Sequence, residues 1–164
     1  MTANEIGFLP DEVVTAEPTR NARLKWVVVV DAAVPAGEAV NAVACVAAAT
    51  GAAVDNLLAH GGPDADGVHH PGLPWAGCSV LTATAEELAA VRAKAVESAG
   101  VLVIDMPRAA QTHRVYDGYL AELVTTPGAE LACRALSLVG PRNRVSAITK
   151  RLGLLTGGAA SPPA

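Results

Sequence analysis

Residues 25–31, which read KWVVVVD, decide the fold. A short β-branched run that ends in an acid is typical of a buried strand in an α/β sheet. Outward from it, VLVID at 101–105 predicts a second such strand, and the segments 78–81 and 131–139 predict two more. Because helical segments separate these strands, the sequence predicts a sheet covered by helices on both faces.

Four helices are predicted around these strands. Residues 38–50 are rich in alanine and stop before Gly51, a favourable residue after a helix C-terminus. Thr84 and Glu87 fit a capping box, which predicts a helix over about 85–98. Apolar spacing predicts two more helices, over residues 116–124 and 141–150. Residues 60–77, which precede the strand predicted at 78–81, are interpreted as a loop.

One α/β domain is predicted over residues 23–155. Residues 1–22 lack a sustained period and are interpreted as a loose leader, and residues 156–164 as a disordered tail. The N-terminus does not have the pattern of a signal peptide, and the densest apolar runs are shorter than a membrane span. Three widely spaced cysteines favour reduced thiols, so we expect a cytoplasmic protein that makes no membrane contact.

Composition limits the kind of partner. A chain that is 51% hydrophobic and 17% charged is not a largely disordered one. Its net charge of −4 argues against a sequence-independent nucleic-acid binder. The segment 140–151 is locally basic, and Gly140 and Pro141 before a helix would leave amides free to hold an anion near Arg142. We therefore expect a small-molecule ligand, which is an anion if this segment binds it. The alternative for this segment is a helix face that is only solvated. A homodimer is also left open.

Five ordered segments within 23–155 resemble one family. They read VVVVD, VPAGEAVNAVACVAAATG, DADGVHHPG, VLVIDMPRAAQTHRVYDGY and ALSLVGPRNRVSAITKRLGLL, and together they resemble the domain-of-unknown-function 2000 family. That family is similar in fold to the archaeal and eukaryotic type of peptidyl-tRNA hydrolase, type II. The resemblance implies a three-layer α/β domain with a four-stranded mixed sheet. It implies no reaction.

The resemblance to the hydrolases fails at their chemistry. They carry a lysine-rich turn after the first strand, whereas residues 33–38 contain no lysine and Glu38 takes one of those places. They carry an aspartate before the last strand, whereas residues 125–128 contain no acid. The loss of both features argues against efficient cleavage of peptidyl-tRNA.

Several polar residues follow predicted strand ends, where α/β sheets usually bind ligands. If the strands ending at Asp31 and Asp105 are neighbours, the two carboxylates form a pair that can do acid–base work; otherwise each caps a turn. Gly37, in a turn, can take a positive φ or admit a ligand to the backbone. Asn41, on an apolar helix, either ties down a loop or meets a ligand.

The densest polar cluster follows Asp105. His113 and Asp117 are four residues apart and can pair on one helix face, either as an oriented general base or as an exposed ion pair. The family resemblance singles out Gln111, Tyr116 and Asp117. The run DADGVHH at 64–70 suggests zinc, but its spacing fits a turn better, so no metal and no cofactor are expected.

The sequence thus predicts a single cleft. A hydrolase or acyl-transfer enzyme for a small polar or aminoacyl-type substrate would orient water and stabilise an oxyanion there. The alternatives are a non-catalytic ligand-binding or accessory protein and a peptidyl- or aminoacyl-tRNA hydrolase. The predicted catalytic residues are Asn41, Asp105, Gln111 and Tyr116, and the predicted substrate-binding residues are Asp31, Gly37, His113, Asp117, Gly140 and Arg142.

Overall fold

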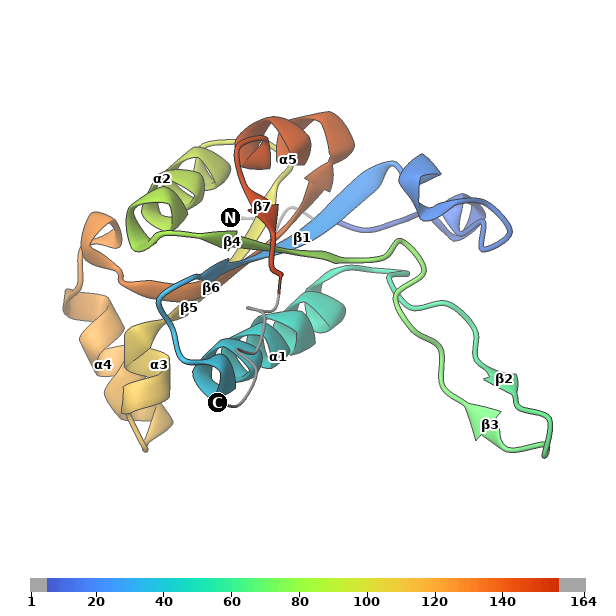
Figure 1. The fold of residues 1–164 in the computed structure, drawn as a ribbon, viewed down its shortest axis with the longest axis horizontal. Coiled ribbons are helices and arrows are strands. Elements are labelled where there is room, and N and C mark those ends of the chain that lie inside the picture. The colour runs from blue at the N-terminus through green and yellow to red at the C-terminus, as the bar shows by residue number, and fades with distance from the viewer. Residues whose placement is uncertain (1–5, 157–164) are drawn as a thin grey trace, which may run out of the picture.

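The computed structural model describes residues 6–156 and contains a five-stranded mixed sheet in the order β5-β6-β1-β4-β7 (Figure 1). The expected sheet had four strands; the fifth, β7, is a two-residue edge strand that pairs with β4. The strand expected over 131–139 begins and ends two residues later, because residues 128–130 form a 3-10 turn before it. The strands are β1 (Leu24–Asp31), β4 (Ser79–Ala83), β5 (Leu102–Pro107), β6 (Cys133–Pro141) and β7 (Gly153–Leu154).

The valine run lies at the centre of this sheet. Val27–Val30 are at most 1% exposed because β1 lies between β6 and β4 and helices cover both faces. Val28 and Val30 pack towards α1 (Ala36–Ala53), whereas Val27 and Val29 pack towards α2 (Ala85–Val96) and α5 (Arg142–Thr149). A strand buried on both faces needs an unbroken apolar sequence, which is why the run does not alternate with polar residues.

The helices form the outer layers (Figure 1). The predicted capping box is present: the Thr84 hydroxyl accepts from the Glu87 amide, and the Glu87 carboxylate accepts from the Thr84 amide. α1 is longer than expected because the segment after Pro35 is already helical. By length and composition α1 is also apolar enough to cross a membrane, a test that core helices pass as well. The remaining helices are α3 (Arg108–Thr112) and α4 (Tyr116–Thr125).

Strand direction decides which residues share an edge of the sheet. β1 is parallel to β4 and antiparallel to β6, and β6 is antiparallel to β5, so β1, β4 and β5 all end at one edge. β6 starts at that edge, which we call the carboxyl rim. Its last residues lie at the opposite edge, where Gly140 pairs with Lys25 and Pro141 with Leu24.

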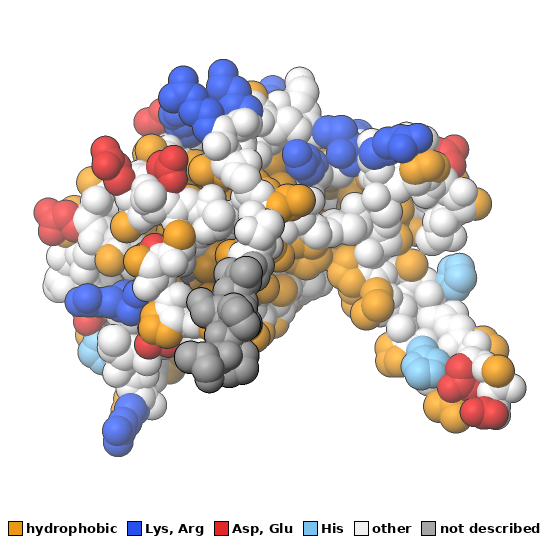
Figure 2. Space-filling view, in the orientation of Figure 1, with side chains coloured by type: hydrophobic (Ala, Val, Ile, Leu, Met, Phe, Trp, Pro, Cys, Tyr) orange, Lys and Arg blue, Asp and Glu red, His pale blue; other side chains and the backbone are white. Residues whose placement is uncertain are grey.

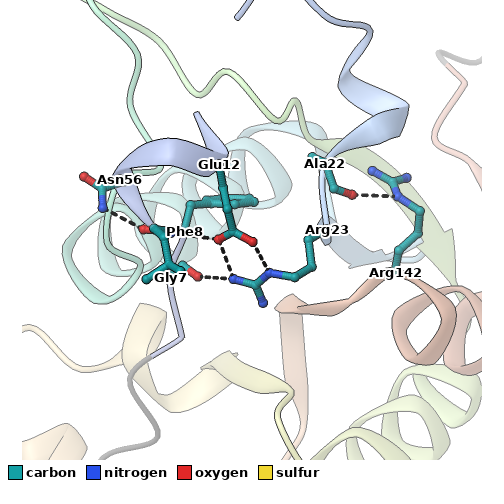
Figure 3. A network of polar contacts seen from close by, with 8 residues as sticks. Gly7, Phe8, Glu12, Ala22, Arg23, Asn56 and Arg142 are labelled. Atoms are coloured by element: carbon teal, nitrogen blue, oxygen red, sulfur yellow. Dashed lines mark hydrogen bonds and ion pairs between the residues drawn. The ribbon is translucent and has the colours of Figure 1, made fainter. Parts of the chain in front are cut away.

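The segment before β1, which the sequence indicates is a loose leader able to pack locally, packs against the domain. Phe8 is 3% exposed and its ring lies 4.7 Å from that of Trp75. Arg23 donates to both oxygens of Glu12, at 2.5 and 2.8 Å, and to the carbonyl of Gly7 (Figure 3). These contacts explain how residues 6–23 pack on the domain although the stretch has no hydrophobic periodicity. Residues 157–164, most of the expected tail, lie outside the described residues.

The region expected to be a loop is a two-stranded arm. Residues 58–74 form a narrow antiparallel ribbon that leaves the body beside the end of α1 and projects away from it (Figure 1). It contains β2 (Gly62–Pro63) and β3 (His69–His70). The sequence did not reveal it because its Gly, Pro and Asp residues have no strand-like alternation.

Candidate functional site

A cleft of about 500 Å³ opens at the carboxyl rim, between the first turns of α1, the end of α3 and the start of β6. α1 follows β1 and α3 follows β5, so both helices begin at the rim and lie side by side (Figure 1). The cleft is lined by Gly37, Glu38, Asn41, Ala110, Gln111, Thr112 and Arg134. Two of the four predicted catalytic residues, Asn41 and Gln111, therefore meet there.

Gln111 joins α3 to α1 through its amide group. Its Nε2 donates to Asn41 Oδ1 at 3.0 Å and to the Glu38 carbonyl at 2.9 Å. Its Oε1 is buried and has no hydrogen-bond partner in the described chain. Both N–H groups of Gln111 Nε2 are used in these two hydrogen bonds. The Gln111 side-chain atom that can still form a hydrogen bond is therefore Oε1, which is an acceptor.

Glu38 and Arg134 complete the cleft, and the sequence did not single out Arg134. The Arg134 guanidinium lies 3.3 Å from a Glu38 carboxylate oxygen, and Arg134 Nε is buried without a hydrogen-bond partner among residues 6–156. Arg134 was missed because the strand was expected to begin at residue 131, which placed it inside a strand rather than at an edge. The available signal was that Arg134 is the only charged residue in β6.

The cleft is positively polarised at the start of α1. Pro35 precedes the helix and provides no side-chain cap, so the first-turn amides have no partner inside the helix. These amides and the helix dipole favour negative charge. The Glu38 carboxylate and Arg134 guanidinium offset one another, so the cleft can bind an acceptor atom at the amides and a polar group beside it.

Gly37 lies in the first turn of α1, and its φ is outside the left-handed region. A Cβ built on it meets nothing within 4 Å. Of the two roles expected for Gly37, the positive φ is therefore wrong. The other role, close approach of a ligand to the backbone, fits a glycine that lines the cleft.

The expected pair of Asp31 and Asp105 does not form because β6 lies between their strands. Asp105 points to the α2 face and accepts from Arg92 Nε at 2.6 Å. Asp31 accepts from the Ala33 amide at 2.9 Å, which is the turn-capping alternative. Asp31 lines a separate pocket of about 140 Å³ together with Arg134.

The expected pair of His113 and Asp117 does not form either. α3 ends at Thr112 and α4 starts at Tyr116, so the two residues do not share a helix. His113 Nε2 instead lies 2.7 Å from a Glu122 carboxylate oxygen. Tyr116 is 72% exposed and its ring packs edge-on against Tyr119. Neither Tyr116 nor Asp117 lines the cleft.

Gly140 and Arg142 lie at the edge of the sheet opposite the cleft, because β6 is antiparallel. The Arg142 guanidinium donates to the carbonyls of Ala22 and Thr19, both at 3.0 Å, so it holds the segment before β1 (Figure 3 shows the Ala22 contact). A Cβ on Gly140 would lie 2.9 Å from the Gly100 carbonyl, so a close backbone contact explains this glycine.

Nucleophiles and metal ligands in the described chain do not gather at the cleft. Burial raises the pKa of the Cys133 thiol to about 12, which disfavours a thiolate next to Arg134. Within residues 6–156, no three His, Cys, Asp or Glu side chains are placed to hold a metal. His70 instead contacts Asp64 at 3.1 Å on the arm.

Comparisons with known proteins give a family and a fold. A family model described as a protein of unknown function (DUF2000) matches residues 24–156. The solved structure of a protein of unknown function from Agrobacterium tumefaciens strain C58 is similar, with a TM-score of 0.70 at 14% identity. That match covers 82% of this chain and 98% of the other. A search of curated proteins found no match.

Proposed function

We propose a small-molecule ligand for this chain, which belongs to the DUF2000 family. In its cleft it binds a small polar molecule that has a carboxylate or acyl oxygen beside an N–H group. The observation that carries the proposal is the convergence of Glu38, Asn41, Gln111 and Arg134 from three elements on one cleft. Its volume lies within the usual range for small-molecule sites, roughly 300–1,000 Å³.

Each group of the cleft has a complementary ligand group. The α1 amides and Arg134 suit a carboxylate or acyl oxygen. Gln111 Oε1 suits an N–H donor, which reaches it once neighbouring side chains that cover this atom move aside. An unpaired buried acceptor costs about 1–3 kcal/mol, so its retention supports a binding role. N-acylated amino acids carry all of these groups.

Hydrolysis or acyl transfer is the reaction that we propose for such a ligand. Water held by the Glu38 carboxylate would attack the acyl carbon, and the oxygen that gains charge would face the α1 amides. The proton would pass from the water through Glu38 to the leaving group. Glu38 is half-exposed beside Arg134, so both groups are within reach of a bound molecule.

A non-catalytic ligand-binding protein is the second candidate. It is favoured by the absence, among the described residues of the cleft, of a nucleophile hydrogen-bonded to a base. The third candidate, a peptidyl- or aminoacyl-tRNA hydrolase with a type II hydrolase-like fold, rests on the family resemblance alone. We expect no efficient cleavage of peptidyl-tRNA. Three free cysteines support the cytoplasmic location that we propose.

The test starts with binding. N-acetylglycine is titrated into the protein and followed by ligand-observed NMR, with N-acetylalanine and N-acetylglutamate as further probes. Arg134→Met and Asn41→Ala should weaken binding at least tenfold. The matched controls Arg151→Met and Asn21→Ala, both exposed and away from the cleft, should not. No binding by any probe, or equal loss in the controls, would overturn the proposal.

Turnover separates the two leading candidates. Each probe that binds is incubated with the protein, and release of acetate is followed by NMR. Release that disappears in Glu38→Gln, with binding retained, supports the hydrolase. Binding without release supports the ligand-binding protein.

A further inference from the structure

The arm of residues 58–74 has a defined shape. The Asp64 carboxylate accepts from the amides of Asp66 and Val68, both at 2.9 Å, and so fixes the turn at the tip. A Cβ on Gly72 would overlap the Ala59 carbonyl, so the two chains approach as closely as they do only with glycine there. The hydrogen bonds of residues 59–73 all join two residues of the arm.

Nothing in the described chain packs against the outer part of this arm. Leu58, Val68 and Leu73 are all more than half exposed, and Leu73 is 76% exposed. An isolated two-stranded ribbon is marginally stable in water, because it orders its backbone without burying apolar surface. The arm therefore lacks a surface to lie on.

Within residues 6–156, no element covers the outer face of α1 either. Residues 39–54 contain no charged side chain, and the row Val40, Ala44, Ala48 and Ala52 is exposed along the helix. Val40 is 69% exposed. α1 and the arm are adjacent along the chain, and the arm points away from the body (Figure 1), so the arm does not cover its own α1.

We infer that the arm of one copy of this chain lies along α1 of a second copy, and that a two-fold axis near the arm's base relates the two. The lengths agree: the 18 residues of α1 span about 27 Å, and the extended ribbon from Leu58 to Asp66 spans about 26 Å. Two such contacts, each about 10 Å wide, bury roughly 1,000 Å² in total, which is the lower limit for a specific interface.

Charge supports this direction of the arm. The arm joins the body beside the C-terminal end of α1, so across the two-fold axis its tip reaches the N-terminal end of the other copy's α1. The tip carries Asp64 and Asp66, and acidic side chains gather at the end of the arm in Figure 2. The start of α1 presents first-turn amides that have no partner inside the helix, and the positive end of the helix dipole. The Arg134 guanidinium beside it offsets the Glu38 carboxylate of its own chain, so the tip and the small ligand proposed above would compete for the same amides.

The oligomeric state of the full chain tests the inference. Sedimentation velocity should give twice the 16.6 kDa of one chain. Val40→Glu on α1 and Leu73→Glu on the arm should each weaken dimerisation at least tenfold. Val124→Glu, at a valine that is 85% exposed on α4, is the matched control and should leave the dimer intact. All three side chains are exposed, and unchanged circular dichroism will show that the variants fold.

Mixing the two disrupted variants distinguishes an exchanged arm from any other dimer. A Val40→Glu copy keeps its arm and a Leu73→Glu copy keeps its helix face, so the mixture retains one intact contact of the two. One buried charge is enough to remove an apolar contact, so a second charge in the same contact adds little, and the mixture should form heterodimers more tightly than either variant forms homodimers. A monomer at all concentrations, a dimer insensitive to both substitutions, or a mixture that associates no better than the separate variants would each overturn the inference.

Discussion

Replacing Gln111 by methionine tests whether this side chain serves stability or binding. The change removes two hydrogen bonds, from Nε2 to Asn41 Oδ1 and to the Glu38 carbonyl. At about 0.5–1.5 kcal/mol each, they contribute roughly 1–3 kcal/mol. The change also removes the buried, unpartnered Oε1, whose desolvation costs about 1–3 kcal/mol. Methionine has a similar length, shape and helix propensity, so it adds no cavity.

The two contributions largely cancel, leaving a difference of at most about 2 kcal/mol in either direction, so Gln111→Met should unfold within about 8 °C of the unaltered protein. Thermal unfolding followed by circular dichroism measures this, and Thr125→Val on α4, an exposed residue that does not line the cleft, serves as the control. In the same samples Gln111→Met should bind N-acetylglycine at least tenfold more weakly. A melting temperature lower by 10 °C or more, with binding retained, would show that Gln111 is a structural tie and refute its role in the cleft.

Three further substitutions are expected to have distinct effects. The Trp26 indole N–H donates to Ser137 Oγ at 2.8 Å, so Ser137→Ala leaves it without a partner in the core and should lower the free energy of unfolding in urea by about 1–3 kcal/mol. Trp26→Phe in the same chain should recover part of this loss. Gly37→Ala should leave the free energy of unfolding unchanged or raise it by up to about 1 kcal/mol, because its φ is compatible with a Cβ, while weakening probe binding; a less stable variant would contradict the helical placement. The hydrogen bond from Arg23 lowers the pKa of Glu12 to about 2, so the stabilising effect of this contact is present above pH 4.5 and lost as the pH falls towards 2. Glu12→Gln should flatten the pH dependence of the free energy of unfolding between these values, and an unaltered dependence would show that the contact contributes nothing.

The elements that could be predicted from the sequence are those whose cause is local. The run Val27–Val30 is apolar throughout because both faces of β1 are buried, and Thr84 and Glu87 satisfy the first amides of α2. The position of Asn41 and Gln111 shortly after strand ends is also a local signal. The two residues meet because β1 and β5 run in the same direction, which their pairing with β6 sets.

The predictions that failed depended on pairing between strands. Asp31 and Asp105 end strands of the same direction, yet β6 separates them. Gly140 was expected to follow a strand as Gly37 does, but it lies at the end of β6, which runs the other way, so it is at the opposite edge. Neither the order nor the direction of strands is encoded in the hydrophobic pattern of one strand, because both are set by contacts far apart in the chain.

Antiparallel β6 explains both the failed pair and the residue that sequence reasoning missed. A strand that starts at the rim places its first residues between the ends of its neighbours, so Arg134 lies where a second carboxylate from an adjacent parallel strand was expected. A pair of carboxylates would have favoured acid–base chemistry, whereas an arginine beside helix amides favours recognition of an acyl or carboxylate oxygen. The mixed topology therefore changes the chemistry of the rim as well as its geometry, and the guanidinium that it introduces is the group whose removal should most weaken ligand binding.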